Sequence, residues 1–60
     1  MDNDMIAALD AFKATQGENW KESLSGCWMK ASYPSGLSDE HKAALQRLRN
    51  QHGPKWLAQQ

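Results

Sequence analysis

The chain has 60 residues, which is enough for one domain with one small core but not for a scaffold that also holds a deep cleft. Seven basic residues balance seven acidic ones, which argues against both a polybasic nucleic-acid binder and an acidic DNA mimic. The single cysteine, Cys27, excludes an internal disulfide framework of the kind that small secreted domains usually need.

The residue types favour helices over strands. The chain has no valine and one isoleucine, Ile6, although β-branched residues are enriched in strands. Three tryptophans supply much of the apolar area for a core. The N-terminal residues are acidic where a secretory signal is basic, and the longest apolar run, residues 5–9, is far too short to span a membrane. We therefore expect a soluble, cytoplasmic, all-α protein.

The first helix is expected over residues 4–15. An acidic stretch, residues 2–4, offers N-terminal caps and favourable charges for the helix dipole. One face carries an apolar stripe at helical spacing, and Gly17 is a suitable stop. The stripe consists of Met5, Ala8, Leu9 and Phe12.

The second helix is expected to begin at Asn19 and to end at Tyr33, which precedes a proline. Asn19 and Glu22 resemble a capping box. Gly26 either permits another helix to approach closely or divides the segment. The apolar face of this helix consists of Trp20, Leu24, Cys27, Trp28 and Ala31.

The third helix is expected to start at Ser38, which is a good cap, and to stop at Gly53, which is followed by Pro54. A last helical turn then carries Trp56 and Leu57 as a lid over the core. The apolar side of the helix combines Ala44, Leu45 and Leu48 with His41 and His52. Residues 1–60 should therefore form a single domain, a compact three-helix bundle with a short C-terminal helical turn.

Neither metal binding nor catalysis is indicated. Cys27, His41 and His52 lack the paired spacing of a zinc site, and we expect both histidines to border the core and to form hydrogen bonds there. Cys27 lies in an apolar stripe, which is typical of an inert thiol rather than a nucleophile. No nucleotide-binding or serine-hydrolase motif is present. We therefore expect no enzymatic activity, no cofactor, no metal and no small-molecule substrate.

Charge is unevenly distributed along the chain. Residues 1–24 hold two basic and five acidic residues, and residues 25–60 hold five basic and two acidic ones. This polarity is compatible with head-to-tail self-association or with docking on a charged protein. On the third helix, polar side chains suited to phosphates and base edges suggest either a recognition helix or an ordinary solvated face, and acidic residues at the start of the helix would repel phosphate. These side chains are Lys42, Gln46, Arg47, Arg49 and Asn50.

Protein binding is the other hypothesis, and two surfaces are candidates for it. One combines Trp56 with the basic side of the third helix, including Arg47 and Arg49, because tryptophan is enriched at binding hot spots. The other combines Met29 with Gly26 on the side of the second helix that faces away from its tryptophans. Trp56 can equally be a residue that closes a thin core.

The order of aromatic and capping residues resembles small uncharacterised proteins of proteobacterial plasmids and other mobile elements. The resemblance covers residues 20–57 and implies a bacterial accessory protein, but it carries over no catalytic residue. It rests on Trp20-Lys21, Leu24, Trp28-Met29, Leu48-Arg49-Asn50, Gly53-Pro54 and Trp56-Leu57. The expected function is therefore non-enzymatic, through a protein partner or a second copy of the chain, with nucleic-acid binding by the third helix as the alternative.

Overall fold

Every regular element of the chain is helical, as the scarcity of β-branched residues predicts. The computed structural model describes all 60 residues, and its radius of gyration of 10.2 Å is that of a compact chain, since about 10 Å is expected for this length. The elements in order are α1 (Asn3–Gln16), the short 3-10 helix η1 (Gly17–Asn19), α2 (Trp20–Lys30) and α3 (Asp39–Ala58).

Helix α1 agrees with its sequence pattern at both ends and along its buried face. The Met5 backbone N–H donates to the Asp2 carboxylate at 2.8 Å, so Asp2 is the residue that caps the helix. Gly17 ends α1 with a φ of 70°, a conformation that favours glycine. All four residues of the predicted stripe are buried: Met5, Ala8, Leu9 and Phe12.

Helix α2 differs from its prediction at both ends. It stops at Lys30 because Ala31 adopts a left-handed conformation with a φ of 56°, and Ala31 is exposed rather than part of the core. At the other end, Asn19 makes no side-chain cap bond, so the capping-box prediction is wrong. Its backbone belongs to η1 and is near helical, whereas a capping residue needs an extended backbone.

Helix α3 begins as predicted, with the Ser38 hydroxyl accepting the His41 backbone N–H at 3.1 Å. It bends at Gly53, whose φ of 73° and ψ of −179° interrupt the helical path. The residues after the bend form the predicted last turn, in which Leu57 is buried. The prediction that His52 lies on the apolar side is wrong, because its position near this bend is exposed.

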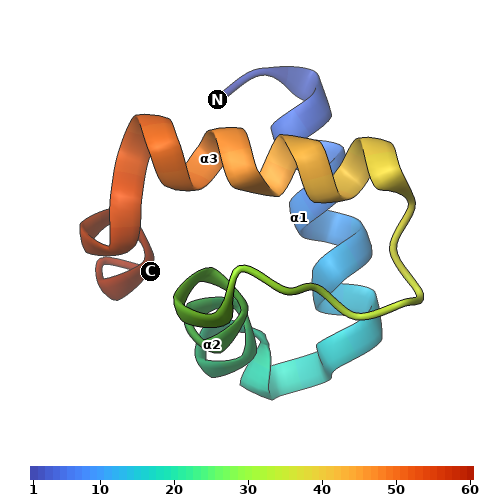
Figure 1. The fold of residues 1–60 in the computed structure, drawn as a ribbon. Coiled ribbons are helices and arrows are strands. Elements are labelled where there is room, and N and C mark those ends of the chain that lie inside the picture. The colour runs from blue at the N-terminus through green and yellow to red at the C-terminus, as the bar shows by residue number, and fades with distance from the viewer.

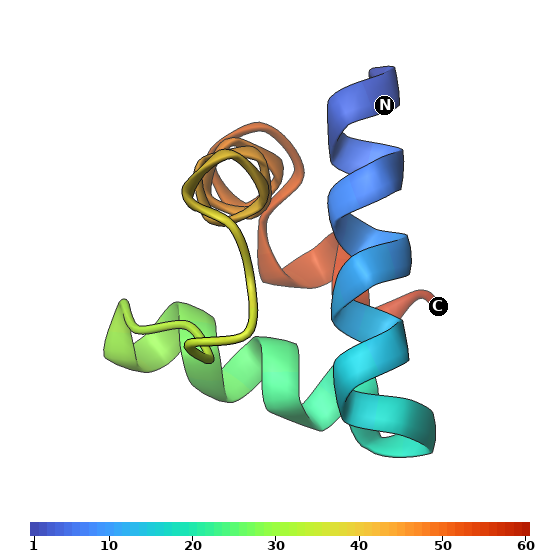
Figure 2. The same ribbon diagram turned by 90° about the vertical axis from the view of Figure 1, so that its right-hand side faces the viewer.

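The helices enclose one apolar core. Figure 1 shows α3 crossing α1, and the segment after the bend turning back towards α2. In Figure 2, which looks along α3, the side of α2 that faces away from α3 has no other element over it. The core contains eleven buried residues, all of them apolar, and includes Leu37 from the connection between α2 and α3. Trp56 is half-buried and packs against this core. None of the helices combines the length and apolar character that crossing a bilayer requires.

Candidate interaction surface

The outer face of α2 presents the most exposed of the large apolar side chains of the molecule. Leu24 points into the core and is fully buried, so the residues on the opposite side of the helix face solvent. Met29 is 85% exposed there. We define the outer face of α2 as Glu22, Ser25, Gly26, Met29 and Lys30, which share this side at helical spacing. An exposed, flexible methionine beside small residues suits an adaptable contact.

Gly26 lies at the centre of this face and does not divide α2, which runs without interruption from Trp20 to Lys30. A side chain at position 26 would meet no atom within 4 Å, so no other helix of this chain approaches the glycine. Neither of the two roles expected for Gly26 within the fold is therefore realised. Because Gly26 has no side chain, the backbone is accessible to another molecule in the middle of this face.

Two hollows flank Gly26. One, of about 580 Å³, lies between α2 and the segment after the α3 bend. The other, of about 550 Å³, lies towards the connection that follows α2. Glu22 and Gly26 line both hollows, so the two hollows lie on either side of the outer face of α2. Met29, Pro54, Leu57 and Ala58 give the first hollow an apolar character.

The C-terminal end of the chain helps to shape the first hollow. Lys21 Nζ donates to the backbone oxygen of Gln60, which ties the start of α2 to the end of the chain. A smaller hollow of about 190 Å³ adjoins it and is lined by Trp28, Met29 and Arg49. Arg49 from α3 therefore lies beside the exposed methionine, a proximity that sequence spacing alone does not show.

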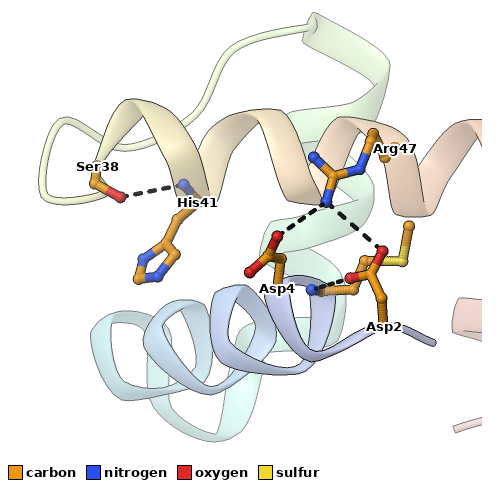
Figure 3. Close-up of polar contacts among 6 residues, drawn as sticks. Asp2, Asp4, Ser38, His41 and Arg47 are labelled. Atoms are coloured by element: carbon orange, nitrogen blue, oxygen red, sulfur yellow. Dashed lines mark hydrogen bonds and ion pairs between the residues drawn. The ribbon is translucent and has the colours of Figure 1, made fainter.

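Arg47 and Arg49 do not form one surface. They are two residues apart and so point to different sides of α3. Arg47 faces the start of α1 (Figure 3). Its guanidinium lies 3.7 Å from the Asp2 carboxylate and 3.8 Å from that of Asp4. These contacts join the acidic first part of the chain to the basic second part. Exposed pairs of this kind contribute little stability, but they compensate the charge of Arg47 locally.

The remaining polar residues proposed for nucleic-acid binding are spread over α3. Gln46 accepts a hydrogen bond from the Tyr33 hydroxyl at 3.1 Å and so holds the connection that follows α2. Lys42 is half-buried and lies 4.0 Å from the Asp39 carboxylate. Arg49 and Asn50 are exposed and have no side-chain partner in the chain.

The possible metal ligands are not brought together. No group of three or more histidine, cysteine, aspartate or glutamate side chains is placed to hold a metal ion. His41 lines a hollow of about 330 Å³ between α1 and α3 together with Asp4, Glu40 and Arg47. Cys27 is half-buried on α2, and burial raises the pKa of its thiol, so the reactive thiolate is disfavoured.

Burial also raises the pKa of the Tyr33 hydroxyl. In the unfolded chain this hydroxyl ionises near its ordinary pKa of about 10, whereas in the folded chain it stays protonated to higher pH. The stability that the protonated hydroxyl contributes is therefore complete below about pH 10. It falls as the pH rises from there towards the raised pKa of the folded chain. We expect Tyr33→Phe to make this alkaline decline shallower, measured as the urea midpoint over a pH series. An equally steep decline in both proteins would contradict this assignment.

Comparison with protein-family models, with curated proteins and with solved structures found no match to this chain.

Proposed function

We propose that this chain is a non-enzymatic accessory protein that acts in the cytoplasm by binding protein through the outer face of α2. The observation that carries the proposal is the 85% exposure of Met29 beside an apolar hollow, in a chain whose other large apolar side chains pack in the core or are far less exposed. The scaffold is a three-helix bundle, closed by the helical turn after Gly53. An origin on a bacterial mobile element, as the sequence resemblance implies, fits a small accessory role.

The physical support for protein binding is the balance of apolar and polar atoms around Met29. Burying a methionine side chain contributes about 1.5–3 kcal/mol, and the neighbouring hollow offers Pro54 and Leu57 as apolar partners. Glu22 and Lys30 add charges at the two ends of the same face. Apolar centre and polar rim are the arrangement found in protein interfaces.

Nucleic-acid binding through α3 has weaker support. Arg47 already contacts two carboxylates, Gln46 is engaged by Tyr33, and Lys42 lies near Asp39. Phosphate binding requires several uncompensated basic groups on one side. Arg49 is the one basic residue of the proposed set that has no acidic neighbour in the chain.

A photo-crosslinking experiment tests the proposal. A benzophenone amino acid replaces Met29 in the full chain, which is expressed in a bacterial host and irradiated in intact cells. We expect covalent adducts with protein at several times the yield obtained from the same group at Ile6, which is 45% exposed on α1. Equal yields at the two positions would overturn the proposal. Adducts with nucleic acid alone would favour the alternative function.

A further inference from the structure

We infer that the partner of the outer face of α2 is a second copy of this chain, packed antiparallel to the first with Gly26 at the crossing point. The inference rests on the proposed function, because it uses the same surface, and it goes further by naming the occupant. Three observations carry it: the placement of charges around Gly26, the open surface at Gly26 and the two flanking hollows.

The charges of this face are complementary to those of the same face on a second copy that lies antiparallel to it. Glu22 precedes Gly26 by four residues and Lys30 follows it by four, so each lies about 6 Å along the helix from the crossing point. In an antiparallel pair, Glu22 therefore faces Lys30 of the second copy, and the same contact recurs on the other side. A parallel pair would place like charges opposite each other.

Neither charge has a partner within its own chain. The ion pairs of the fold join Arg47 to Asp2 and Asp4, and Lys42 to Asp39, so none of them involves Glu22 or Lys30. Both side chains are exposed. A two-fold contact requires a surface that is complementary to itself, and this pair of charges meets that condition without rearrangement of the chain.

The shape of the face fits the same arrangement. Because a side chain at position 26 would meet nothing, two α2 helices can approach closely at their glycines. Met29 projects one turn beyond Gly26, and the hollows on both sides of Gly26 are available to Met29 of the second copy. The methionine that is exposed in one chain thus becomes buried between two.

The contact is small, and the association should be correspondingly weak. Helix α2 has 11 residues and is about 16 Å long, so the interface falls below the roughly 1,200 Å² typical of stable complexes. We expect monomers in dilute solution and dimers only at high protein concentration.

Charge exchange provides the test. In Glu22→Lys both ends of the face are basic, and in Lys30→Glu both are acidic, so each variant repels itself. An equimolar mixture of the two variants pairs opposite charges at both contacts. Sedimentation equilibrium should show dissociation constants raised roughly tenfold or more for each variant alone and near-native association for the mixture. The double variant Glu22→Lys/Lys30→Glu should also associate as the native chain does.

Asp10→Lys is the matched control, because it changes the net charge as Glu22→Lys does but lies exposed on α1. It should associate like the native chain, and circular dichroism checks that every variant is helical. A native chain that stays monomeric at millimolar concentration would overturn the inference. So would single variants that associate normally, or a mixture and a double variant that both fail to restore association.

The two proposals can fail separately. Crosslinks from position 29 that contain only other proteins would leave the proposed function standing and overturn self-association. Crosslinks no more frequent than those from position 6 would remove the proposed function itself. Adducts of twice the chain's mass, together with recovery in the mixture, would support both.

Discussion

Replacing Phe12 with alanine is expected to remove at least about a third of the protein's free energy of unfolding. Phe12 is fully buried and is the largest of the side chains that are completely enclosed in the core. Truncating a buried phenylalanine costs about 3–5 kcal/mol, because apolar contact is lost and a cavity remains. A 60-residue domain has about 3–9 kcal/mol of total stability, so this loss removes from about a third to all of it.

Ile6→Ala is the matched control on the same helix. Ile6 is 45% exposed, so its truncation should cost less than about 1 kcal/mol and leave the far-UV circular dichroism spectrum unchanged. Thermal and urea unfolding of the two variants measure the difference. Similar losses in both would contradict the assignment of α1's buried and solvent faces.

The buried faces of the helices follow directly from sequence periodicity. The stripe of α1 and the apolar side of α3 were predictable because apolar residues recur at three- and four-residue intervals between clear caps. Asp2 and Ser38 both cap as their residue types predict. The bend at Gly53 was also predictable, since glycine followed by proline cannot continue a helix.

The end of α2 could not be predicted in the same way. The proline after Tyr33 marks the last residue at which the helix can stop, but the chain leaves the helix earlier, at Ala31. Nothing in the local sequence favours a left-handed alanine. The Tyr33 hydroxyl donates to Gln46 on α3, a contact between residues far apart in sequence that helps to fix the path of the connection.

The candidate surface was predictable only in part. Helical spacing places Met29 opposite the tryptophans, and the structure confirms that it is exposed. Spacing does not show that Arg47 turns towards Asp2 and Asp4, because that contact depends on how α1 and α3 cross. The hollow beside Met29 likewise depends on the bend at Gly53, which brings Leu57 back towards α2.

Gly53→Ala and Gly26→Ala are expected to change stability in opposite directions. Neither glycine has an atom within 4 Å of an added Cβ, so both substitutions report on backbone conformation rather than on clashes. Gly53 has a φ of 73° and a ψ of −179°, a region essentially restricted to glycine, and alanine there should cost about 1–3 kcal/mol. Gly26 is helical, and alanine there should stabilise the monomer by about 0.5–1 kcal/mol.

Urea unfolding at low micromolar concentration measures both effects, because self-association through α2 is negligible there. Shifts of the same sign would contradict the conformations assigned to the two glycines. A gain at Gly26 would mean that α2 keeps a glycine where alanine would be more stable and where no part of the fold needs the space. Gly26 is half-buried and lies at the centre of the proposed contact with a second copy, where a residue without a side chain would let two α2 helices approach closely.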